Sequence, residues 1–112
     1  MNRIGPQTPM NVVSPLDYEV VAASDTAEPL GATGRLGDYL KRLIIVPAAA
    51  NCGDVILLDG DQTIFTWTGG DPVALLDLKP IVVEIDALSK VAGGWKITTG
   101  ASVSVVAIGD FT

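Results

Sequence analysis

The sequence predicts an all-β domain, and three observations lead to this prediction. Short apolar runs rich in Val and Ile recur along the chain at the regular spacing that is typical of a β-sandwich or barrel. Gly, Pro, Asp and Asn residues separate these runs, as turn residues do between strands. No segment of convincing length has helical periodicity, and no sequence repeat is visible. We therefore expect about seven or eight short strands in one domain.

The segment 38–48 is expected to form a long strand. It ends at Pro47, which lacks the N–H donor that continues a ladder. A helix is the alternative, because the leucines within 36–43 have helical spacing. The run 44–46, Ile-Ile-Val, is β-branched and favours the strand. The sequence further predicts strands over 18–23, 81–88, 95–99 and 102–108, a loop over 28–37, and a helical turn or irregular crossing over 73–80.

The segment 54–67 is the clearest local unit and predicts a β-hairpin. An apolar run precedes Asp59-Gly60, which is a strong turn signal, and apolar and polar residues alternate after it. The alternation assigns the side chains of the second strand to two faces, with Ile64 and Thr66 on one and Thr63, Phe65 and Trp67 on the other.

The segment 102–108, Ser-Val-Ser-Val-Val-Ala-Ile, carries aliphatic side chains on both faces of its predicted strand. Such a strand suits the inside of a sandwich or a subunit interface, and its spare apolar residues point to a second buried surface. Alternation places Val103, Val105 and Ala107 on one face and Ser102, Ser104, Val106 and Ile108 on the other.

The composition excludes several classes of function. The chain has 112 residues, of which 48% are apolar, so it suits one packed domain. Its net charge of −6 and scattered basic residues make nucleic acid a poor partner. The absence of histidine removes Ser-His-Asp and Cys-His catalysis and His-ligated metals. The single cysteine, Cys52, forms no intrachain disulfide and fits folding in a reducing cytoplasm.

The segment 1–16 differs from the rest of the chain. Its three prolines interrupt any helix or ladder, so we expect an extended arm, with a frayed terminus as the alternative. It lacks the apolar core of a signal peptide, and the apolar runs of the chain are shorter than the roughly 20 residues that span a bilayer. The expected organisation is an arm over 1–16 and a sandwich over 17–112.

Candidate sites each have a structural alternative. Asp59 and Asp61 could start a calcium loop, but the EF-hand ligand series is absent and a hairpin turn is favoured. No basic residue near Cys52 in sequence activates its thiol, so an unreactive cysteine in a turn is expected. Glu84 and Asp86 share one strand face, whereas a glycosidase needs carboxylates facing each other across a cleft.

Two tryptophans, Trp67 and Trp95, are candidates for stacking on a glycan. Large aromatic residues near strand ends also serve as core or interface anchors, and this is the favoured interpretation. The residues thus predict a β domain with no catalytic residue, no cofactor site and no metal site.

The chain from Leu36 to Phe111 resembles small structural proteins of tailed-bacteriophage virions. Four segments carry the resemblance, and they cover about two thirds of the chain. They are LKRLIIVPA, GDVILLDGDQTIFTWTGG, LDLKPIVVEI and GGWKITTGASVSVVAIGDF. The resemblance implies a single-domain β-sandwich that is jelly-roll-like, without catalysis or cofactor.

The resemblance also implies a role: a capsid decoration or cementing protein bound outside the major capsid lattice. It implies a homo-oligomer, a trimer rather than a dimer, that is made in the bacterial host cytoplasm and located in the virion. The partners would be the major capsid protein or other virion proteins, with neither nucleic acid nor membrane. The alternatives are a neck, collar, tail or head-fibre structural protein, or a glycan-binding module. The arm would drape over a neighbouring subunit through Ile4, Met10, Val12 and Val13.

Overall fold

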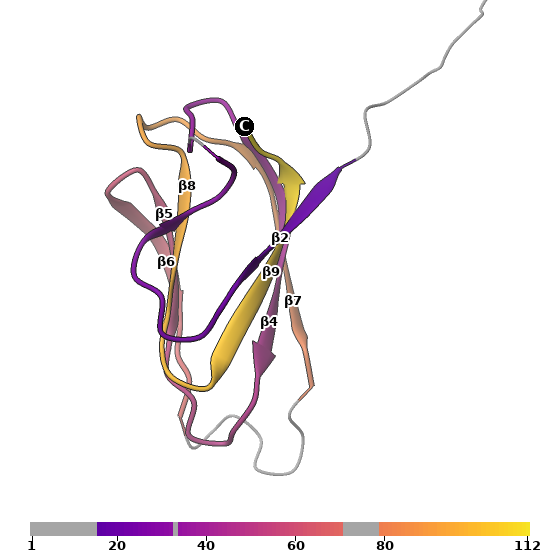
Figure 1. Ribbon diagram of the computed structural model, residues 1–112, viewed down its shortest axis with the longest axis vertical. Helices are drawn as coiled ribbons and strands as arrows, with labels where there is room; N and C mark the ends of the chain where they lie inside the picture. Colours follow the sequence, from indigo (N-terminus) through magenta and orange to yellow (C-terminus); the bar gives the residue numbers. More distant parts are fainter. Residues whose placement is uncertain (1–15, 33, 71–78) are drawn as a thin grey trace, which may run out of the picture.

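The structure, a computed structural model, describes residues 16–32, 34–70 and 79–112, and all regular structure within them is β (Figure 1). Two four-stranded sheets pack face to face, with the strand orders β2-β9-β4-β7 and β3-β8-β5-β6. This confirms the predicted all-β sandwich. The strands are β2 (Asp17–Val21), β3 (Glu28–Pro29), β4 (Tyr39–Pro47), β5 (Val55–Asp59), β6 (Gln62–Trp67), β7 (Ile81–Leu88), β8 (Trp95–Thr99) and β9 (Val103–Asp110).

The connectivity is that of a jelly roll, as expected. β5 pairs with β6, β4 with β7, β3 with β8 and β2 with β9, so the pairings are nested as in one long antiparallel hairpin. Two further pairings, β4 with β9 and β5 with β8, join these pairs into the two sheets.

The β5–β6 hairpin forms where the sequence predicts it. Asp59 pairs with Gln62, so Gly60 and Asp61 make a two-residue loop. Gly60 has a φ of 63°, which glycine adopts without strain. A glycine at the first central position is the signature of the type II′ turn, whose twist matches that of the two strands.

A β-bulge in this hairpin corrects one predicted orientation. The register shifts between the pairs Leu57–Phe65 and Leu58–Thr63, which leaves Ile64 as the extra residue. Thr63 therefore shares the outer face with Leu58, whereas the prediction put it on the face of Phe65 and Trp67. Simple alternation fails at this point because a bulge adds one residue to one strand only.

A second bulge explains the helical spacing of the leucines near the start of β4. Leu40 pairs with Gly109 and Arg42 with Ile108, so β4 has one more residue than β9 between these pairs. The extra residue turns both Leu40 and Leu43 into the core, although they are three positions apart. The helical alternative is therefore wrong, because β4 is hydrogen-bonded to β7 and β9 along its length.

Other element bounds differ slightly from the predictions. β2 and β9 lie within a few residues of their predicted ranges, and β7 and β8 match them. The predicted loop over 28–37 contains the short strand β3, which pairs with Lys96 and Ile97 of β8. A two-residue strand carries too little pattern to be seen in the sequence. The predicted crossing over 73–80 falls largely on residues 71–78, which lie outside the described residues.

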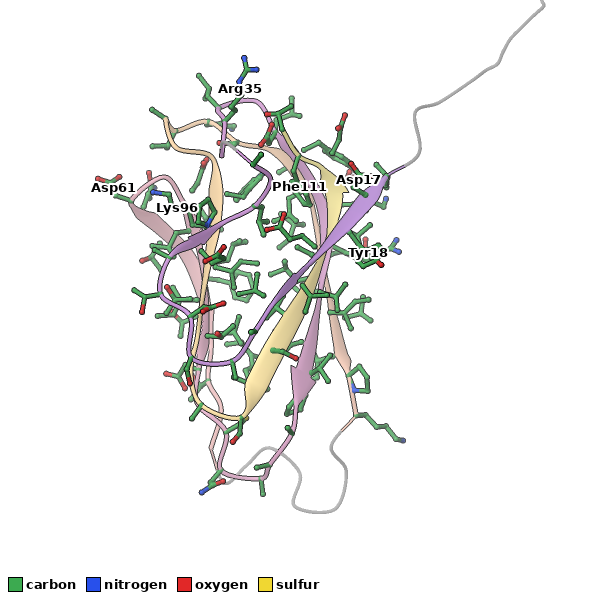
Figure 2. The ribbon with its side chains drawn as sticks, in the orientation of Figure 1. Asp17, Tyr18, Arg35, Asp61, Lys96 and Phe111 are labelled. Carbon is green, nitrogen blue, oxygen red and sulfur yellow. The ribbon has the colours of Figure 1, made fainter. Side chains whose placement is uncertain are left out.

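Alternating side chains from both sheets make the core. On β9, Val103, Val105 and Ala107 point inward and are buried, as alternation predicts. Phe111 lies between the two sheets and packs against the core (Figure 2). Gly109 is needed beside it, since a Cβ there would lie 2.1 Å from the carbonyl oxygen of Tyr39. The fully buried large side chains are Leu30, Leu40, Leu43, Ile45, Leu57, Ile97, Val21, Val55, Val103 and Val105.

Buried polar side chains fasten the loops to this core. The Asp38 carboxylate accepts hydrogen bonds from the N–H and Oγ1 of Thr112, at 3.2 and 2.8 Å, which ties the chain end to the start of β4. The Thr99 hydroxyl donates to the carbonyl of Ala22 at 2.6 Å and accepts from the N–H of Asp25 at 3.0 Å. These bonds compensate the desolvation of groups that burial would otherwise penalise.

Adjacent leucines on β5 test the assignment of faces. Leu57 is fully buried and Leu58 is half-buried on the outer face. We expect Leu57→Ala to lower the free energy of unfolding by about 2–5 kcal/mol, because it leaves a cavity in the core. Leu58→Ala should cost about 1 kcal/mol or less, since the site is open to solvent. Urea unfolding of both variants measures the difference, and equal losses would contradict the described orientation of β5.

Candidate interaction surface

The outer face of the sheet β2-β9-β4-β7 is unusually apolar for a surface in contact with water. The exposed fractions of its side chains reach 74% for Tyr18, 59% for Val20 and 58% for Val82. Figure 2 shows the Tyr18 side chain on the outer side of β2, away from the space between the sheets. Leu16 and Leu88 at its margins are also exposed. Contiguous apolar surface of this kind marks an interaction site rather than ordinary scatter.

The strand register aligns four aliphatic side chains across the whole width of this sheet. Val20 of β2 lies opposite Val106 of β9, which lies opposite Ile44 of β4. Ile44 in turn lies opposite Val82 of β7. All four point outward, because their neighbours along each strand point into the core. We call Val20, Val106, Ile44 and Val82 the aliphatic row.

The next row of the same face is mixed but has no net charge. Tyr18 lies opposite Ile108, Ile108 opposite Arg42, and Arg42 opposite Glu84. The Arg42 Nε donates to the Glu84 carboxylate at 2.9 Å. The pair is exposed, so it contributes at most about 1 kcal/mol to stability. It does neutralise the two charges that border the aliphatic row.

Beside this ion pair, the Tyr39 hydroxyl donates a hydrogen bond to the Asp86 carboxylate. That hydrogen bond raises the pKa of Tyr39 above its usual value of 10.0, and desolvation and the charge of Asp86 act in the same direction. Ionising the phenol would break the bond and place two negative charges together. Glu84 and Asp86 thus lie on one exposed face, as predicted, and each has a partner on β4.

The outer face of the other sheet is more polar. Its rows combine Ile56 with Thr66 and Thr98, and Leu58 with Thr63 and Lys96. The structure therefore has two unlike outer faces, and only the β2-β9-β4-β7 face presents an aliphatic row.

A hollow of about 350 Å³ opens between the edges of the two sheets. Its carboxylates already have protein partners: Asp59 accepts from the Ser89 hydroxyl at 2.6 Å and from the Lys90 N–H at 2.8 Å. Glu84 is held by Arg42. The hollow is thus an apolar gap between sheet edges, and its two carboxylates are not arranged as a catalytic acid pair. Its lining residues are Asp59, Ile64, Glu84, Ile85, Ala87, Leu88, Lys90 and Trp95.

The two aspartates of the hairpin have different surroundings. Asp59 is buried and fastens the segment after β7, while Asp61 is exposed at the tip of the hairpin. The hairpin interpretation of Asp59-Gly60 is confirmed. Within 16–32, 34–70 and 79–112, no group of three or more His, Cys, Asp and Glu side chains is placed to hold a metal ion.

The two tryptophans have different surroundings. Trp95 is only 3% exposed, and its indole Nε1 donates to the carbonyl of Asp38 at 3.0 Å. Trp95 is thus a core residue, as the favoured interpretation predicted. Its ring faces are not available to a glycan. Trp67 is half-buried at the end of β6 and packs against the core. Cys52 is buried as well, and its N–H donates to the carbonyl of Ala49 in a turn.

The expected arm anchors Ile4, Met10, Val12 and Val13 lie outside the described residues, so they stay predictions. Sequence reasoning missed the aliphatic row as a unit, because its members come from four separate strands. One signal pointed to it: Val106 and Ile108 are aliphatic on the outward face of a strand whose other face is also apolar.

Comparisons with known protein families, with curated proteins and with solved structures find no match. In the part of the chain that the structure describes, no helix is long and apolar enough to cross a membrane.

The phenol of Tyr39 gives a pH-dependent prediction. In Tyr18→Phe the remaining tyrosine is Tyr39, and the tyrosinate absorbance of the folded protein should titrate above the ordinary value of about 10. The same variant unfolded in urea is the control and should titrate near that value. Because the folded pKa is the higher one, this contribution to stability is complete below about pH 10 and is lost as pH rises through the folded pKa. Coincident folded and unfolded titrations would contradict the hydrogen bond.

Asp59 and Asp61 offer a matched pair for the hairpin. Asp59→Ala should lower the free energy of unfolding by about 1–3 kcal/mol, since it removes the acceptor of two hydrogen bonds. Asp61→Ala should change it by no more than about 0.5 kcal/mol, because the side chain is exposed. Calcium should leave the melting temperature of the wild-type protein unchanged. A calcium-dependent rise that Asp61→Ala abolishes would instead support a cation loop.

Proposed function

We propose that this chain is a non-enzymatic structural protein of a tailed-bacteriophage virion. The proposed role is a capsid decoration or cementing protein that binds the outside of the major capsid lattice as an oligomer. The observation that carries the proposal is a jelly-roll domain with an aliphatic row across one outer sheet face. The resemblance of Leu36–Phe111 to virion structural proteins supports the same role.

The chemistry of the described residues agrees with a role in assembly. Val20 and Val82 present apolar area to water, and burying it against another protein is favourable by roughly 25 cal/mol per Å². The buried carboxylates Asp38 and Asp59 are used by the fold itself. An apolar surface with internally satisfied polar groups is suited to binding by contact area, and many copies on a lattice add avidity.

The charge of the chain favours the outer surface of a particle. A net charge of −6 repels packaged nucleic acid and suits contact with solvent. We propose that the protein is made in the bacterial host cytoplasm and then joins the virion as a homo-oligomer.

Two alternatives share parts of this support. A neck, collar, tail or head-fibre position would use the same sandwich and the same apolar face, and only the partner differs. A glycan-binding module would depend on Trp67, because Trp95 is buried in the core. The half-buried position of Trp67 against the core gives this alternative no specific support.

Co-sedimentation tests the capsid role. The purified chain is mixed with capsids of its phage assembled without it, and with complete virions as the saturated control. We expect saturable binding to the first, with a whole number of copies per capsomer, and little binding to the second. Binding that is confined to isolated necks or tails would move the protein to those positions. A chain that binds no virion part would contradict the proposal.

A further inference from the structure

We infer that the outer face of the sheet β2-β9-β4-β7 binds the same face of a second copy, with the two aliphatic rows packed against each other across a two-fold axis. The inference gives the proposed oligomer a contact surface, yet it does not depend on the capsid: the pairing can hold or fail whatever the virion partner is.

Most of the exposed large hydrophobic side chains among the described residues lie on this face or at its margins. The two other exposed large hydrophobic side chains of the described residues lie apart from each other: Leu36 is in the loop before β4, and Ile64 is in β6. The outer face of the other sheet mixes aliphatic residues with threonines and a lysine. An aliphatic row is best covered by apolar area, and the second copy supplies it.

The charges of the chain affect the pairing at long range and at the contact in different ways. The whole chain has a net charge of −6, so two copies repel each other at long range. On this face, however, Arg42 is paired with Glu84, and Asp86 accepts a hydrogen bond from Tyr39. The Arg42–Glu84 pair next to the row is therefore neutral within each copy, while Asp86 keeps its negative charge one row further from the aliphatic row. Salt should strengthen the pairing, because it screens the long-range repulsion.

The side chains of the aliphatic row also suit packing against a second sheet. Three members of the row are valines and the fourth is isoleucine, so β-branched side chains make up the centre of the face. Two such faces can pack about 10 Å apart with their strands roughly aligned, as in a β-sandwich. The middle of the row lies between Val106 and Ile44, on adjacent central strands. A two-fold axis through that point would bring each central side chain near its own counterpart.

The area of the face gives an expected affinity for the dimer. The four strands are five to nine residues long, and at about 3.4 Å per residue and about 4.8 Å between strands they make a face of about 500 Å². Two faces then bury about 1,000 Å² in total, which is the lower limit for a specific interface. We therefore expect a reversible dimer with a dissociation constant in the micromolar range. A two-fold contact gives a dimer, in place of the trimer expected from the resemblance.

Sedimentation velocity of the full chain over a range of concentrations tests the pairing. The wild type should pass from monomer to dimer, at lower concentrations in high salt. Val20→Lys/Val82→Lys should weaken the dimer by about 100-fold or more, because both copies lose apolar contact and gain a desolvated charge. The substitutions reduce the net negative charge, which alone would favour association. Both positions are more than half exposed on edge strands, so folding should be retained.

Leu36→Lys is the matched control, since Leu36 is as exposed as Val20, at 59%, but lies in a loop away from the row. It should leave the dimer unchanged. Ile44→Cys should be linked into a dimer by a thiol-reactive cross-linker that spans the sheet spacing of about 10 Å, whereas Thr66→Cys on the other outer face should not. The native Cys52 is buried and should not compete.

The outcomes separate this inference from the proposed function. A wild type that stays monomeric at high micromolar concentration overturns the pairing, as does a dimer that Val20→Lys/Val82→Lys leaves intact. If the wild type is monomeric and the double variant loses capsid binding, the face belongs to the capsid contact, and the proposed function stands without the dimer. If the wild type dimerises but binds no virion part, the pairing stands and the proposed function fails.

Discussion

Strand β9 lies between β2 and β4 and pairs with both of them. Its pairings with both strands fix the register of three strands at once. Its inward residues Val103 and Val105 complete the core, and its outward residue Val106 joins the aliphatic row. A one-residue slip of β9 would exchange these faces, so core and outer surface are specified together.

The ends of the sandwich are held by hydrogen bonds that involve few residues. Asp38 binds Thr112 and also accepts from the indole of Trp95 through its carbonyl, so one residue fastens the chain end and the largest core side chain. The Asp59 carboxylate likewise accepts hydrogen bonds from the Ser89 hydroxyl and the Lys90 N–H. The buried carboxylates of Asp38 and Asp59 therefore stabilise the fold through these hydrogen bonds. The apolar character of the outer surface comes from the outward side chains of the strands.

The two outer faces divide the surface of the protein into unlike parts. One carries the aliphatic row beside a neutralised ion pair, and the other carries threonines and a lysine among its aliphatic residues. If the row is used between copies, the polar face and the loops are the surfaces that remain for the proposed virion partner. This arrangement would let one small domain link to itself and to a lattice at the same time, with contact areas that are each modest but repeated.

Patterns in the sequence were enough to predict the all-β class, the Asp59-Gly60 hairpin, the strands over 81–88 and 95–99, and the inward residues Val103, Val105 and Ala107. These features are local: turn chemistry and period-two alternation depend only on neighbours along the chain. The tertiary structure alone decided the β-bulges that reorient Thr63 and Leu43, the short strand β3 and the burial of Trp95. It also decided the aliphatic row, since Val20, Ile44, Val82 and Val106 become neighbours only through pairing between strands distant in sequence.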